Sequence, residues 1–137
     1  MGFQAIEQTI RERFEAQWPT LQPDVPYVFD NQGKGDPSSQ NNTAWVRLTV
    51  LMGNSSQAEM GNKQRWRRPG VVTVQIFIPT GDGTGLATEL GDSVRDIFEG
   101  VTISGVIFRA TSLVRAGIDG SWLQYNSNTT FQSDELR

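Results

Sequence analysis

The residue types that enzymes most often use for nucleophilic and acid–base chemistry are only partly present in this chain. The sequence contains no cysteine and no histidine. Their absence excludes a thiol nucleophile, an imidazole base, disulfide bonds and zinc sites built from Cys and His. Three features remain that could carry chemistry or binding: a glycine-rich turn, a group of carboxylates and a basic cluster. The spacing within each decides what it can do.

The glycine-rich turn spans Gly81–Gly85, between a strand pattern and a helix pattern. Phosphate-binding loops occupy this position, because the backbone N–H groups at a helix N-terminus attract anions. Here Leu86 stands where a dinucleotide fingerprint needs its third glycine, and no Gly-Lys-Ser/Thr sequence follows. We therefore predict a tight turn, with Asp82 or Thr84 as the helix N-cap and no bound cofactor.

Carboxylates recur along the helix that follows this turn: Glu89, Asp92, Asp96 and Glu99. Asp92 and Asp96 share a helix face, a spacing that a metal site or an acid–base pair could use. Arg95 lies between them, and the apolar residues lie on the other side of the helix. We therefore predict a solvated face or a contact surface for a neighbouring subunit, with no metal ligand and no catalytic residue.

The basic cluster concentrates cations around a tryptophan: Lys63, Arg65, Trp66, Arg67 and Arg68. Arginine and tryptophan are favoured at protein interfaces, and the same combination can stack on bases and bind phosphates. The net charge of −3 gives no general attraction for nucleic acid. A protein interface, a nucleic-acid surface and a solvated strand end all stay open as interpretations.

Two periodic patterns position these features. Val72, Val74, Ile76 and Ile78 alternate with other residues, as in a strand with one buried face. From Leu86 to Phe98 the apolar residues recur every three or four positions, as on one face of a helix, and Gly100 ends it. We predict that this strand and this helix pack on each other.

The rest of the chain supplies one more helix and further strands. An amphipathic helix is predicted from about Gly2 to Trp18, ended by Pro19, with Phe3, Ile6, Ile10 and Phe14 on its apolar face. Strands are predicted over 44–52, 105 to about 115 and 121 to about 133, with a short extended segment at 25–29 and a short connecting segment at 101–104. The polar loops 30–43 and 53–62 are expected to be mobile in a free subunit.

These elements predict one α+β domain over residues 1–137. We expect a mainly antiparallel sheet of four to five strands, with both helices packed on one face. No apolar run approaches the ~20 residues that a membrane span requires, and the N-terminus lacks the features of a secretory signal. We expect a soluble protein made in the cytoplasm, with no membrane partner.

The order of these segments resembles the tail terminator (tail completion) proteins of long-tailed bacteriophages. The resemblance rests on the N-terminal helix, the A-W-V-R-L-T-V-L strand, the R-W-R-R-P-G-V-V-T-V-Q-I-F-I-P-T-G-D-G-T-G segment, the helix after it and the closing G-S-W-L-Q-Y strand. Its most specific part is Val71–Phe98. No catalytic or binding motif comes with it, so the candidate interface residues are those of the basic cluster and the helix carboxylates.

The resemblance implies a structural virion protein and not an enzyme. Such a protein forms a ring, usually a homohexamer, on the head-proximal end of the tail tube, and is assembled in the host cytoplasm. There it stops tube growth and provides the attachment surface for head-completion (neck) proteins. DNA passes through the ring at most, without sequence-specific binding. A head–tail joining protein, or more remotely a nucleic-acid-binding module that uses the basic hairpin, is the alternative.

Overall fold

Two helices and seven strands form the described part of this computed structural model. It describes residues 2–31, 43–58, 60–61 and 64–136, so Lys63 and most of the predicted loop 30–43 lie outside the described residues. The elements run α1 (Phe3–Leu21), β1 (Tyr27–Phe29), β2 (Trp45–Met52), β3 (Ser56–Gln57), β4 (Arg65–Pro79), α2 (Gly85–Phe98), β5 (Thr102–Ile103), β6 (Val106–Asp119) and β7 (Trp122–Leu136). In the described chain, neither helix is long and apolar enough to span a membrane.

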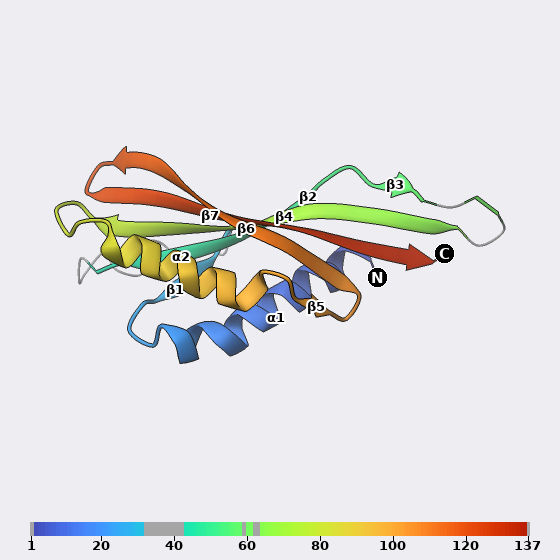
Figure 1. The fold of residues 1–137 in the computed structure, drawn as a ribbon, viewed down its shortest axis with the longest axis horizontal. Coiled ribbons are helices and arrows are strands. Elements are labelled where there is room, and N and C mark those ends of the chain that lie inside the picture. The colour runs from blue at the N-terminus through green and yellow to red at the C-terminus, as the bar shows by residue number, and fades with distance from the viewer. Residues whose placement is uncertain (1, 32–42, 59, 62–63, 137) are drawn as a thin grey trace.

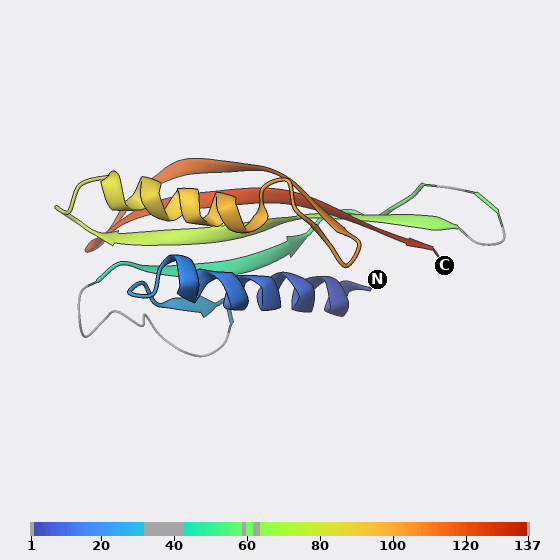
Figure 2. The ribbon, with the colours of Figure 1, turned by 60° about the horizontal axis from the view of Figure 1, so that its bottom comes forward.

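The strands form one mixed sheet in the order β1-β2-β4-β7-β6-β5, with β3 beside β4. β1 pairs with β2 in parallel, and the other pairs are antiparallel. Figures 1 and 2 show that the sheet is strongly twisted and that both helices lie on the same side of it. The α+β class is confirmed, whereas the predicted count of four to five strands is too low. The strands missing from that count are short, and two of them span only two residues.

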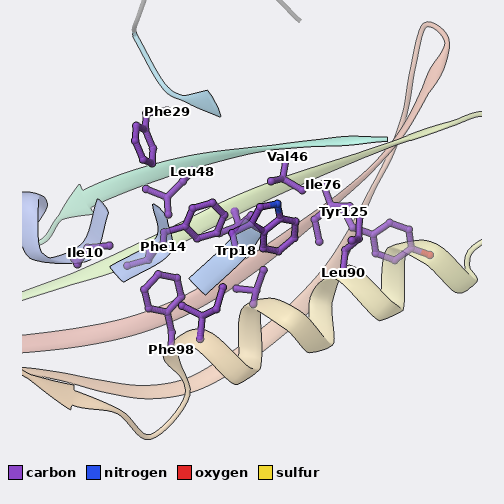
Figure 3. Packing of buried hydrophobic residues seen from close by; sticks show 14 of the residues in the cluster. Ile10, Phe14, Trp18, Phe29, Val46, Leu48, Ile76, Leu90, Phe98 and Tyr125 are labelled. Carbon is purple, nitrogen blue, oxygen red and sulfur yellow. The ribbon is translucent and has the colours of Figure 1, made fainter. Parts of the chain in front are cut away.

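The core lies between the helices and one face of the sheet. Phe14 is at its centre, stacked on Trp18 at 5.2 Å and on Phe98 at 6.3 Å between ring centroids. Figure 3 shows these rings facing the strand residues Leu48 and Ile76. The predicted apolar face of α2 is confirmed, since Leu90, Val94, Ile97 and Phe98 are buried. α2 therefore packs with the face that its 3.6-residue apolar period predicts.

α1 begins where it was predicted, but it differs from the prediction at its C-terminal end and in the burial of Phe3. It continues through Pro19 to Leu21, although a proline within a helix removes one backbone hydrogen bond and normally ends the helix. The last turn is still closed, since the N–H of Gln22 donates to Trp18 O at 2.8 Å. Ile6, Ile10 and Phe14 are fully buried as predicted, but Phe3 is 50% exposed and is not a core residue. The first turn of α1 lies beyond the edge of the core, so Phe3 stays exposed although it fits the apolar period of the helix.

β4 begins at Arg65, so the basic residues Arg65–Arg68 are part of this long strand. Pro69 and Gly70 lie inside it, where a proline would normally interrupt a ladder. The neighbouring chain leaves the ladder at this point, because β2 ends at Met52 and β3 begins at Ser56. Gly53 N–H still donates to Pro69 O at 2.8 Å. The nitrogen of Pro69, which carries no N–H donor, therefore faces the gap between β2 and β3.

Candidate assembly interface

The basic cluster lies on a projecting part of the sheet that we call the arm. The arm consists of Arg65–Arg68 of β4, Ser133–Leu136 of β7 and the short strand β3, which are paired side by side. Figures 1 and 2 show it extending beyond both helices, at the opposite end from the glycine-rich turn. Two of the strands there continue directly from the core, so the arm is an extension of the same sheet.

Arg67 and Asp134 form a bidentate ion pair across the two long strands of the arm. The two residues are direct neighbours in the β4–β7 register. Arg67 Nε lies 3.2 Å from Asp134 Oδ1, and Nη2 lies 3.3 Å from Oδ2. The hydrogen bonds from Arg67 lower the pKa of Asp134 below its ordinary value, and the nearby charges of Arg67 and Arg65 act in the same direction. The same pairing raises the pKa of Arg67.

Arg68 forms a second ion pair on the helix-facing side of the arm. Its Nε lies 3.1 Å from Glu135 Oε2, and its Nη1 donates to Ser55 Oγ at 3.2 Å. The guanidinium lies over the ring of Phe3, 4.8 Å from its centroid. Phe3 is thus the contact of α1 with the root of the arm, which accounts for its position outside the core.

These contacts change the interpretation of the basic cluster. The sequence left a protein interface, a nucleic-acid surface and a solvated strand end open, and the structure adds that Arg67 and Arg68 each pair with a carboxylate of the same chain. Asp134 and Glu135 were missed, although the acidic pair near the C-terminus carries the charge that would complement the arginines. A strand register relating residues 67 positions apart was needed to bring them together. Arg65 and Trp66 lie beside them, and Trp66 is half-buried.

The predicted carboxylate face of α2 is present. Glu89, Asp92, Asp96 and Glu99 are all exposed. Arg95 lies 3.5 Å from Asp92 and 3.4 Å from Asp96, which leaves this face with an excess of negative charge. Glu99 has a different contact: its Oε1 accepts a hydrogen bond from the backbone N–H of Thr111 in β6. The face is well separated from the arm (Figure 1).

The glycine-rich turn forms a shallow recess and not a phosphate loop. Gly81 and Gly83 have positive φ values of 95° and 78°, which only glycine adopts without strain. Thr84 is the N-cap residue, one of the two predicted, and its side chain makes no capping hydrogen bond. The recess of about 360 Å³ is lined mainly by Thr80, Thr84, Arg115, Ile118 and Leu123. In the described residues, no group of three acidic side chains is placed to hold a metal ion.

An aromatic cluster lies on the sheet face opposite the helices. Trp45 stacks on Phe77 at 4.2 Å between centroids and meets Trp122 edge-on at 6.3 Å. Arg47 lies over both Trp45 and Phe77 and donates to Gln75 Oε1 at 2.7 Å. Residues of β2 and β4 that point away from the helices therefore form a second, smaller packed surface.

The fold and these surfaces define a small two-layer α+β protein with charged surfaces at separate places on the molecule. The chain belongs to the phage tail terminator protein family, whose model matches residues 5–120. It is therefore a structural component of a phage tail, and family membership points to a protein without enzymatic activity. Membership also implies contacts with other phage proteins.

Comparison of structures agrees with this fold. Among the solved structures that match, one has a TM-score of 0.64 and 18% sequence identity, over 96% of this chain and 95% of the other. At that identity the likeness extends to the fold alone. A search of curated proteins finds no match.

Proposed function

We propose that this protein forms a ring-shaped homo-oligomer at the head-proximal end of the tail tube. The ring ends tube polymerisation and presents a surface to head-completion proteins. The observation that carries the proposal is the family match together with the arm, an extension of the sheet that lies outside the packed core. A ring subunit must contact a copy on each side, so it needs exposed surfaces such as the arm that are not used in packing its own core.

The ring requires two different patches that meet between copies. A closed ring of one chain is built from heterologous contacts, in which the two patches are distinct. The arm supplies Arg65, Trp66, Arg67 and Arg68, and the α2 face supplies Glu89, Asp92, Asp96 and Glu99. Lys63, which the sequence also proposes for the interface, lies outside the described residues. The two surfaces lie at different places along the molecule (Figure 1), which suits contacts between copies and not within one. The tail tube is the other candidate partner for the arm.

The ion pairs within the arm suggest that Arg67 and Arg68 stabilise the arm itself. Arg67–Asp134 and Arg68–Glu135 link the two long strands of the arm beyond the helix-packed core. The arm then meets its partner as a pre-ordered surface, which reduces the entropy lost on binding. The same pairs reduce the net positive charge, which disfavours the nucleic-acid alternative.

Electron microscopy of the purified protein, alone and with tail tubes, tests this proposal. We expect closed rings, or rings on one end of each tube, and no further tube growth from capped ends. Light scattering gives the mass of the assembly in parallel. A protein that stays monomeric in both mixtures and leaves tube growth unchanged contradicts the proposal. Binding to isolated heads and not to tubes would favour the head–tail joining alternative.

A further inference from the structure

Exposed apolar side chains gather on β6. The large apolar residues Ile107, Leu113, Val114 and Ile118 are 41%, 36%, 52% and 67% exposed. Every residue from Ser112 to Ala116 is exposed, in contrast to the alternating burial of the neighbouring β7. Such a strand is costly to leave in water and is prone to pair with another chain.

β6 is also an edge strand over most of its length. On one side it pairs with β7, and on the other β5 covers only Val106 and Ile107. In the part of the chain that the structure describes, no strand lies beside Ser112–Arg115 on that outer side. The backbone N–H of Thr111 is already bonded to Glu99 Oε1 at 3.1 Å. The open stretch therefore begins at Ser112.

Two register irregularities lie at the ends of the open stretch of β6. The β6–β7 register shifts between Phe108 and Thr111 and again between Arg115 and Gly117. Such bulges bend a strand and interrupt further pairing. Between them a short regular segment remains, with Val114 on the sheet face away from the helices and Leu113 on the helix side, against Gly91. An added strand could contact apolar side chains on both faces.

The opposite edge of the same sheet offers a matching stretch. β1 pairs with Val46, Arg47 and Leu48 of β2, and the described residues place no strand beside Thr49–Met52 on that side. Leu51 is 52% exposed, as is Val114. The registers place both side chains on the sheet face away from the helices. The two open edges thus have similar length and apolar residues on the same face.

We propose that Ser112–Arg115 of β6 pairs with Thr49–Met52 of β2 in a second copy of this chain. This inference rests on the proposed ring and names one of its contacts. Pairing opposite edges of one sheet is heterologous, so it continues from copy to copy. It keeps the helices of all copies on one side of a continuous sheet and brings Val114 beside Leu51 of the next copy.

Site-specific cross-linking tests this pairing, because the chain has no cysteine to interfere. Val114→Cys is labelled with a benzophenone maleimide, assembled and irradiated, and the linked peptides are identified by mass spectrometry. We expect bands of two or more chains, with the cross-link in residues 49–52. Thr130→Cys is the matched control: it is exposed on the same face of the sheet but lies on the central strand β7. It should give few links between chains.

The outcomes separate this inference from the ring itself. Cross-links from Val114 to β6 of another copy would indicate two-fold pairing and overturn the inference. An assembled ring without links from β6 to β2 would also overturn it while leaving the proposed function intact. A chain that is monomeric alone and with tubes would contradict both. As a second measurement, Val114→Lys should weaken self-association by about tenfold or more, whereas Leu21→Lys, on α1, should not.

Discussion

Arg13 on α1 donates a hydrogen bond from Nε to the carbonyl oxygen of Ile97, 2.6 Å away in the last turn of α2. The last four carbonyls of a helix lack partners within it, and a cation near them is favourable because of the helix dipole. Gln22 adds a second contact between the helices, from Nε2 to Ser93 Oγ at 2.9 Å. The two helices are therefore joined by directional bonds as well as by the core.

Arg13→Ala should lower the free energy of unfolding by about 1–3 kcal/mol, because a partly buried carbonyl loses a charged donor. Urea denaturation measures this change. Gln8→Ala is the control, since Gln8 lies on the exposed side of α1 and its side chain donates a hydrogen bond to Glu12 of the same helix. Equal stability of the two variants would show that the bond between the helices contributes nothing.

Leu90→Ala should cost about 2–5 kcal/mol, since this side chain is fully buried between α2 and the sheet. Glu89→Ala, one position earlier on the exposed face, should change stability by less than about 0.5 kcal/mol. Both are measured by denaturant unfolding. A loss below about 0.5 kcal/mol for Leu90→Ala would refute the assignment of the buried face.

Gly70→Ala should destabilise the root of the arm. A Cβ atom there would lie 2.6 Å from Leu51 O and closer still to the ring of Phe131. We expect a loss of about 1–3 kcal/mol from the forced shift. Gly85→Ala is the matched control, because nothing lies within 4 Å of the added atom at the start of α2. Unchanged stability of Gly70→Ala in thermal unfolding would contradict the close packing at this point.

The Arg67–Asp134 pair should make the arm sensitive to acid. Because the pKa of Asp134 is lowered in the folded chain, its contribution to stability is present above its ordinary value of 3.8 and is lost as the pH falls through the lower folded value. Asp134→Asn should remove that part of the acid dependence. Hydrogen exchange of the arm amides between about pH 5 and 3 measures it. A wild-type profile identical to that of Asp134→Asn would contradict the prediction.

Local periodicity was enough to predict the centre of this fold. The alternation in Val72–Ile78 and the helix pattern of Leu86–Phe98 each report which face is buried, and both were confirmed. β3 and β5 could not be predicted in this way, because two residues carry no period. The parallel strand β1 depends on a long-range neighbour and not on its own three residues.

The candidate interface was predictable only in part, for the same reason. Sequence composition identifies the basic cluster and the α2 carboxylates, and the structure places the latter on an exposed face. The partners of Arg67 and Arg68 come from the far end of the chain, so no local pattern reveals them. The contact of Phe3 with Arg68 was hidden because Phe3 fits the apolar period of α1 yet lies beyond the core.

The role of the arm can be separated from its internal stability by a charge exchange. Arg67→Asp combined with Asp134→Arg restores an ion pair at the same register position with the charges reversed. If Arg67 serves mainly to hold the arm together, this double variant should assemble nearly as well as the wild type. Assembly as poor as that of Arg65→Glu with Arg67→Glu would instead show that the charge of Arg67 meets a partner directly.

Tail length in a phage carrying Arg65→Glu with Arg67→Glu tests the central claim most directly. The change leaves the helix-packed core intact but puts two carboxylates beside Asp134, so circular dichroism should show a folded protein. We predict that electron micrographs will show overlong tails or tails that fail to join heads, and that light scattering will show impaired ring formation. Normal rings, together with tails of normal length joined to heads, would contradict the claim that the arm is an assembly surface.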